Sequence, residues 1–176
     1  GQIHRARKPG GRELALKIQY PGVARSVDSD VDNLATLLRR LEFLPLTFDV
    51  DAIAAEAKRQ LRLETDYEAE ARHLERYGRL VADMSDEVVV PRVDRPLTTR
   101  RVLAMDWIDG EPLEKLASEA VPQSRRNAAA RTLQLLVLRE LFEFRFMQTD
   151  PNFDNYLYIP GTQQLALLDL GSAYEF

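Results

Sequence analysis

Two short segments decide the fold of this chain: Asp150-Pro151-Asn152-Phe153-Asp154-Asn155 and Leu167-Leu168-Asp169-Leu170-Gly171. In the first, an Asp precedes an Asn by five positions in a polar loop, and in the second a single Asp follows an apolar strand. Carboxylate and amide oxygens are the hard ligands that Mg²⁺ prefers, and Mg²⁺ keeps open positions for phosphate oxygens. We therefore expect Asn155 and Asp169 to hold a metal ion, and Asp150 to orient a nucleophile.

Apolar periodicity and turn residues predict the elements around these segments. A Pro-Gly-Gly turn joins two alternating segments into a hairpin near the start of the chain, and a Pro-Gly turn joins another near its end. Hairpins at both ends with helices between them favour an α+β fold over a doubly wound parallel sheet. The expected strands are 3–5, 13–19, 88–90, 98–106, 156–159 and 164–168; the expected helices are 23–44, 49–84 with Asp49 as cap, a short one after 112, and a largely buried one over 125–146.

A carboxylate and a lysine lie where apolar residues are expected. On a helical wheel drawn through 49–84, Glu64 points along the apolar face, and an unpaired buried carboxylate would cost several kcal/mol. Lys17 interrupts an otherwise apolar strand and is the best candidate for its partner. Alternatively, Glu64 reaches water and Lys17 marks an edge strand. Asp66 and Glu70, on another face of the same wheel, are interpreted as solvated helix charges.

The order of these motifs along the chain is more specific than any one of them alone. The D-x-x-x-x-N spacing also occurs at Asp28 and Asn33, in a segment expected to be helical and without a strand-ending Asp downstream. At Asp150 it follows a strand Lys, a helix Glu and an apolar helix, and it precedes strand-Asp-x-Gly. That is the order of parts in a kinase active site.

Composition excludes other classes of function. Twenty-four basic and 28 acidic residues give a net charge of −4, and no segment concentrates Lys and Arg, so nucleic acid is not an expected partner. The chain has no Cys and two scattered His, which argues against disulfides, a thiolate nucleophile or a zinc site. No apolar run approaches the roughly 18 residues that a membrane span needs.

The motifs resemble those of the UbiB/AarF family of atypical protein-kinase-like proteins along essentially the whole chain. The resemblance rests on five runs: Gly1-Gln2-Ile3-His4-Arg5-Ala6, Leu16-Lys17-Ile18-Gln19-Tyr20-Pro21-Gly22-Val23, Glu64-Thr65-Asp66-Tyr67 with Glu70-Ala71, Phe146-Met147-Gln148-Thr149-Asp150-Pro151-Asn152 with Asn155, and Leu168-Asp169-Leu170-Gly171. The Gln-Thr-Asp-Pro-Asn loop is similar to that of the branch acting in coenzyme Q biosynthesis.

The resemblance implies a single kinase-like domain, with an N-lobe over 1–106 that carries inserted helices, and a hinge with part of the C-lobe over 107–176. It implies that Glu64 pairs with Lys17, that Asp150 takes the catalytic-loop position, and that Asn155 and Asp169 take the metal positions. Asp106, Trp107 and Ile108 would contact the adenine through their backbone, and Gln2 would lie in the hairpin that covers the phosphates.

The chain departs from ordinary protein kinases in several ways. It has no G-x-G-x-x-G loop, Gln148-Thr149-Asp150 replaces His-Arg-Asp, and Leu170 stands where Phe is usual. Against the family pattern the domain is expected to be truncated at both ends, since it begins inside the phosphate-covering hairpin and has seven residues after Asp169.

The expected function is that of a Mg²⁺-dependent, ATP-binding atypical kinase or ATPase-like domain that supports ubiquinone biosynthesis or isoprenoid-lipid handling. ATP or ADP and Mg²⁺ are the expected cofactors, and lipids or proteins of ubiquinone biosynthesis are candidate partners. The resemblance implies a place on the cytoplasmic or mitochondrial matrix side, peripheral to a membrane through segments outside this chain. Two alternatives remain open: a small-molecule phosphotransferase of the aminoglycoside-kinase type, and a nucleotide-binding pseudokinase scaffold.

Overall fold

The computed structural model describes residues 1–39, 49–150 and 152–176, without the side chains of 23–28, 60 and 62–64. The first sheet has the order β1-β2-β4, with β1 (Gln2–Arg7), β2 (Glu13–Ile18) and β4 (Val102–Asp106) all antiparallel. Gly10 and Gly11 close the β1–β2 turn with φ of 102° and 91°, which L residues adopt only with strain. The predicted hairpin is confirmed. Because β2 is the central strand, the interpretation of Lys17 as an edge-strand residue is wrong.

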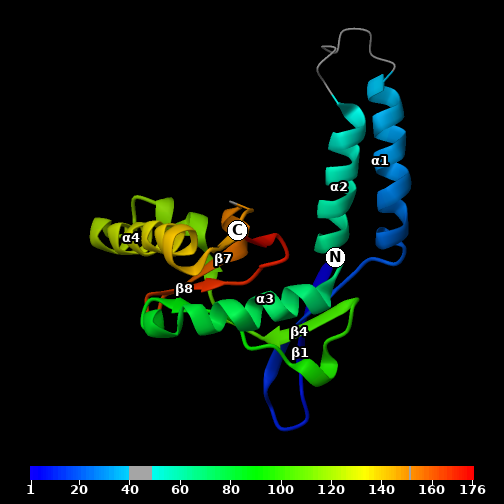
Figure 1. Cartoon of the computed structure of the whole chain (residues 1–176). Coiled ribbons are helices and arrows are strands. Elements are labelled where there is room, and N and C mark those ends of the chain that lie inside the picture. Colours follow the sequence, from blue (N-terminus) through cyan, green and yellow to red (C-terminus); the bar gives the residue numbers. More distant parts are fainter. Residues whose placement is uncertain (40–48, 151) are drawn as a thin grey trace.

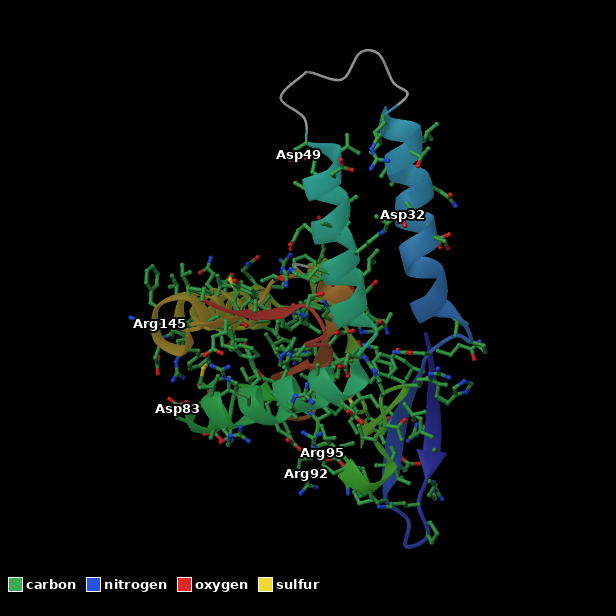
Figure 2. All side chains as sticks on the ribbon, turned by 45° about the vertical axis from the view of Figure 1, so that its right-hand side comes forward. Asp32, Asp49, Asp83, Arg92, Arg95 and Arg145 are labelled. Carbon is green, nitrogen blue, oxygen red and sulfur yellow. The ribbon has the colours of Figure 1, made fainter. Side chains whose placement is uncertain are left out.

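Two helices project from this sheet as an antiparallel pair (Figure 1). They are α1 (Val23–Arg39) and α2 (Val50–Glu64), and Lys58 of α2 donates to Asp32 of α1 at 2.6 Å. Figure 2 labels Asp32 on α1 and Asp49 at the start of α2. Asp49 caps α2 as predicted, since its Oδ1 accepts the N–H of Ala52 at 2.9 Å. The end of the expected helix 23–44 lies outside the described residues.

The single long helix expected over 49–84 is wrong. The chain bends sharply after Glu64 and a separate helix, α3 (Tyr67–Leu80), begins (Figure 1). Asp66 is its N-cap, with φ −107° and ψ 89°, and its side chain accepts the N–H groups of Glu68 and Ala69. This cap satisfies two backbone N–H groups at the start of α3. In a continuous helix, carbonyl groups of the preceding turn would accept from them. Asp66 is therefore a structural cap and not a solvated charge.

The second half of the chain packs small sheets against helices. One sheet has the order β3-β8-β7-β5, and a second pairs β6 with β9. The hairpin formed by β7 and β8 is confirmed close to its predicted bounds, whereas the β6–β9 pairing was not predicted. The bounds are β3 (Val88–Val89), β5 (Glu111–Pro112), β6 (Phe146–Gln148), β7 (Tyr156–Ile159), β8 (Gln164–Leu167) and β9 (Ala173–Glu175); short helical turns are η1 (Ala82–Met84), η2 (Arg95–Leu97), η3 (Leu113–Ala117) and η5 (Phe153–Asn155).

The helix expected over 125–146 is α4 (Gln123–Arg139), continued by one π turn, η4 (Glu140–Phe144). It is not largely buried as predicted. Leu136 and Phe144 are buried, but Leu138 is 53% and Phe142 74% exposed. Only part of the apolar surface of this helix faces the core, since Leu135, Val137 and Leu141 are also at least 40% exposed.

One hydrophobic core joins the two halves of the chain. It runs from Ala15 on β2 and Leu103 on β4 through Leu74 and Tyr77 on α3 to Phe146 and Leu167. The site residues on β2, α3 and the loops after β6 and β8 are therefore held by the same packed side chains. Within the described residues, no helix is both long and apolar enough to cross a bilayer.

Candidate active site

Lys17 lies between two carboxylates from distant parts of the chain. Its Nζ donates to Glu70 Oε1 at 2.8 Å and Oε2 at 2.9 Å, and to Asp169 Oδ2 at 2.6 Å. The Lys17 side chain is 18% exposed, and that of Glu70 is 2% exposed. Strand β2, helix α3 and the segment after β8 thus meet at one ammonium group. A buried lysine requires such partners, because an unpaired charge would pay its full desolvation cost.

The carboxylate that pairs with Lys17 is Glu70, and the assignment of this role to Glu64 is corrected. A helical wheel through 49–84 assumes a continuous helix, but at Thr65 and Asp66 the chain changes direction and the helical register restarts. On α3 alone, Glu70 shares the buried face with Tyr67, Ala71 and Leu74. It is therefore not the solvated charge that the sequence analysis expected. Glu64 ends α2, and its side chain lies outside the described residues.

Burial and neighbouring charge set the protonation of this cluster. Burial raises the pKa of Glu70 to about 7, although the charge of Lys17 opposes the shift. For Lys17, burial acts to lower the pKa, but Glu70 and Asp169 outweigh it and hold the pKa above its ordinary value. Burial acts to raise the pKa of Asp169, but Lys17 and the N–H of Gly171 bring it below its ordinary value. With both carboxylates ionised, one cation faces two anions, and the cluster favours the approach of a further cation.

The Asp150 loop follows β6 and is held by hydrogen bonds from its own residues. Asn155 Nδ2 donates to Asp150 Oδ2 at 2.9 Å, and the N–H of Asn152 donates to Oδ1 at 3.3 Å. Asn155 is buried, and its carbonyl accepts the N–H of Leu168 at 2.8 Å. The loop and the strand that leads into Asp169 are therefore fastened to each other. Asn155 and Asp169 both line the cavity described next, and their metal-binding role stays a prediction.

A cavity of about 500 Å³ opens beside this cluster. Lys17, Asn155 and Asp169 line it, as do the segment 106–108 and the further carboxylates Asp109 and Asp154. Ala15, Met105, Leu157 and Leu168 supply much of its apolar wall. The mixture of an apolar wall and a few convergent polar groups is typical of small-molecule sites.

The predicted hinge residues line this cavity. The Asp106 side chain turns towards arginines: Arg12 donates from Nε at 2.8 Å and Arg92 from Nε at 2.9 Å. Trp107 is held by its Nε1 donating to Asp109 Oδ1 at 2.7 Å and by Arg5, whose guanidinium lies 4.8 Å from the ring centroid. These contacts fix the segment against the sheet.

Gln2 does not line the cavity. It begins β1, is exposed, and its side-chain oxygen lies 3.1 Å from His4 Nε2. Sequence reasoning also missed two buried residues, Glu70 and Gln148. An Asp in the N-cap position, followed by a Glu on the apolar face, is the signal that would have found Glu70.

The chain has relatives that align with its full length. The chain is 42% identical over 177 residues to "Atypical kinase COQ8B, mitochondrial" of Danio rerio, and the alignment covers all of this chain and 28% of that protein. It is 37% identical over 176 residues to "Atypical kinase COQ8, mitochondrial" of Saccharomyces cerevisiae, covering 34% of that protein. The chain therefore spans about a third or less of the length of these relatives.

A solved structure of Rv3197 from Mycobacterium tuberculosis, in complex with erythromycin, has the same fold. The TM-score is 0.79 at 24% identity, over 99% of this chain and 44% of that one. The family model described as the ABC1 atypical kinase-like domain matches residues 1–176, which confirms the resemblance found in the sequence. The chain thus belongs to the ABC1 (UbiB/AarF) family of atypical kinase-like proteins.

Proposed function

We propose that this chain is the nucleotide-binding part of a Mg²⁺-dependent atypical kinase or ATPase. The observation that carries the proposal is the cavity that brings Lys17, Asn155 and Asp169 together beside the segment 106–108. These three side chains offer charge and polar atoms for phosphates and a metal, and the rest of the lining offers apolar surface and backbone for a base. Residues 1–106 then act as the N-lobe and 107–176 as the hinge with part of the C-lobe.

Lys17 would bind phosphate oxygens of ATP or ADP. Glu70 holds its ammonium group through both carboxylate oxygens, which fixes the lysine against the cavity wall. Electrostatic groups that are already in place stabilise developing charge without reorganisation. The apolar wall of Ala15, Met105 and Leu157 suits an adenine ring, with 106–108 as the hinge.

Asn155 and Asp169 fit a magnesium ion that carries nucleotide. Among the described residues no group of three or more His, Cys, Asp or Glu could by itself hold a metal. Mg²⁺ commonly uses only one or two protein oxygen ligands, together with substrate phosphates and water. The Asp169 carboxylate and the Asn155 amide oxygen supply that donor set. The bound ion would neutralise charge on the transferring phosphate.

Asp150 would orient the attacking group. Asn155 Nδ2 and the N–H of Asn152 both donate to its carboxylate, which sets the orientation of the side chain. A carboxylate in this position accepts the proton of a substrate hydroxyl or positions a water molecule. The activity would be that of a kinase if a substrate hydroxyl accepts the phosphate, and that of an ATPase if water does.

The pathway assignment extends the proposal beyond the site. Relatives named atypical kinase COQ8 support a role in ubiquinone biosynthesis or isoprenoid-lipid handling, with lipids or other proteins of that pathway as partners. Their names place them in mitochondria, which supports a place on the mitochondrial matrix side or its cytoplasmic counterpart, peripheral to a membrane.

Thermal unfolding of the full chain with ATP or ADP, each with and without Mg²⁺, tests the nucleotide site. Ligand at 100 times its dissociation constant adds about 2.7 kcal/mol. For a domain of this size that raises the midpoint by roughly 5 to 10 °C. The shift should require Mg²⁺, disappear in Asp169→Asn and persist in Asp86→Asn, a matched change at an exposed carboxylate. An undiminished shift in Asp169→Asn contradicts the assignment.

Single-turnover phosphate release separates an enzyme from a scaffold. An enzyme releases phosphate from bound ATP, and the rate falls at least a hundredfold in Asp150→Ala. A chain that binds Mg-ATP but releases phosphate no faster than Asp150→Ala is a pseudokinase scaffold.

A further inference from the structure

Gln148 is a buried amide that none of the proposed roles uses. It ends β6, pairs with Ala173 on β9 and is 7% exposed. It does not line the nucleotide cavity. A buried amide needs hydrogen-bond partners, and Gln148 finds them in the backbone of the candidate site.

The side chain of Gln148 joins the two segments that carry the candidate site. Its Nε2 donates to the carbonyl of Asp169 at 2.5 Å, and its Oε1 accepts the N–H of Asp150 at 3.0 Å. Both partners are backbone groups, so the contact fixes the main chain at Asp150 and Asp169 and leaves both carboxylates available. An amide offers a donor and an acceptor at once, whereas a carboxylate only accepts and a thioether does neither of these well.

The backbone of Gln148 is anchored from the other side. Its N–H donates to Glu140 Oε1 at 3.4 Å, and the same oxygen accepts the hydroxyl of Tyr77 at 2.6 Å. Tyr77 lies on α3, the helix that carries Glu70. Gln148 thus links Asp150 and Asp169 to each other and to the helix that holds Lys17.

We propose that Gln148 is a positioning residue that sets the spacing between Asp150 and Asp169, and with it the ability of the site to take up metal-bound nucleotide. This inference rests on the proposed function. Without the amide, the carbonyl of Asp169 and the N–H of Asp150 lose their shared partner, and the spacing between these two residues is less tightly fixed. Metal-dependent binding then weakens more than binding of the base.

The test compares Gln148→Met, Gln148→Glu and wild type in the full chain. Met keeps the length of the side chain and removes both bonds, whereas Glu keeps the acceptor for Asp150 and loses the donor to Asp169. Gln164→Met is the matched control, because Gln164 Nε2 also donates to a backbone carbonyl, that of Ser85 at 2.6 Å, outside the cavity. The readouts are the Mg²⁺ concentration for half-maximal ATP binding and the affinity for adenosine, which has no phosphates.

We expect the half-saturating Mg²⁺ concentration to rise at least tenfold in Gln148→Met and at least threefold in Gln148→Glu. Adenosine affinity should stay within twofold of wild type in both, and Gln164→Met should match wild type throughout. An unchanged Mg²⁺ requirement overturns the inference, as does an equal loss of adenosine affinity, which would indicate general loosening. Should Gln148→Met fail to fold, Gln148→Glu decides by the same criteria. Absence of Mg-ATP binding in wild type would instead overturn the proposed function and this inference together.

Discussion

Tyr77 and Tyr158 provide a matched test of the buried contacts that support the site. Their side chains are 0% and 3% exposed, so both hydroxyls are inaccessible to bulk water. The Tyr77 hydroxyl donates to Glu140 at 2.6 Å, whereas that of Tyr158 has no partner among the described residues. Changing either residue to Phe removes the same atom, so the difference between the variants measures the partner.

The two substitutions are expected to have different effects on the free energy of unfolding. A hydrogen bond to a charged group contributes about 1.5 to 3 kcal/mol, and Glu140 keeps only the longer bond from the N–H of Gln148 when the Tyr77 hydroxyl is removed. Tyr77→Phe should therefore destabilise by about 2 to 3 kcal/mol, which lowers the unfolding midpoint by about 4 to 12 °C. Tyr158→Phe should be neutral or stabilise by up to about 1 kcal/mol, because an unpaired hydroxyl is costly to bury.

Calorimetry and urea unfolding of both variants at pH 7 measure these values. A double-mutant cycle with Glu140→Leu measures the interaction free energy between Tyr77 and Glu140. The double variant should lose less stability than the sum of the two single variants, because both partners of the bond are removed together. Equal destabilisation by Tyr77→Phe and Tyr158→Phe would refute the reasoning, because it would make the hydroxyl contact with Glu140 irrelevant.

The stability of the chain should also depend on the protonation of Glu140 and on the close packing around Gly110. Burial raises the pKa of Glu140 despite the hydrogen bond from Tyr77, so the native state binds this proton more tightly than the unfolded state and stability falls as pH rises above about 4.5. Glu140→Gln should flatten this decline in urea unfolding measured from pH 4.5 to 7.5, and an unchanged profile would contradict the assignment. Gly110→Ala would bring a Cβ within 2.8 Å of Leu157 Cβ and 3.1 Å of the Tyr158 carbonyl. It should destabilise by about 1 to 3 kcal/mol and weaken nucleotide binding, whereas Gly161→Ala, with open space around it, should stay within about 0.5 kcal/mol in the same calorimetric comparison.

Local patterns in the sequence predicted much of the fold. The hairpin of β7 and β8 follows from alternating residues and the turn at Pro160 and Gly161. A charge in an apolar strand needs a partner, which makes Lys17 a predicted member of an ion pair, and the structure supplies two carboxylates. Chemistry and order along the chain were sufficient to predict that Asn155 and Asp169 lie at one cavity.

Features that depend on tertiary context were not predictable in the same way. The break between α2 and α3 contains neither Pro nor Gly, so a helical wheel extended across it selects Glu64 in place of Glu70, and the Asp66 cap is the one local signal of the new helix. On α4, Leu136 is buried whereas Leu135, Val137 and Leu138 are exposed, and only packing decides which of these apolar positions face the core. Gln148 gave no periodic or compositional signal, because its importance lies in two backbone groups that are 2 and 21 residues away.

The central claim is that the cavity beside Trp107 binds magnesium nucleotide. Trp107 is the only Trp of the 176 residues, and it lines the cavity. Its emission, isolated as the difference between the full chain and a Trp107→Phe variant, should change saturably when Mg-ATP is titrated. The change should require Mg²⁺ and vanish in Asp169→Asn. Emission that stays constant up to millimolar Mg-ATP, or that changes equally in Asp169→Asn, would contradict the account.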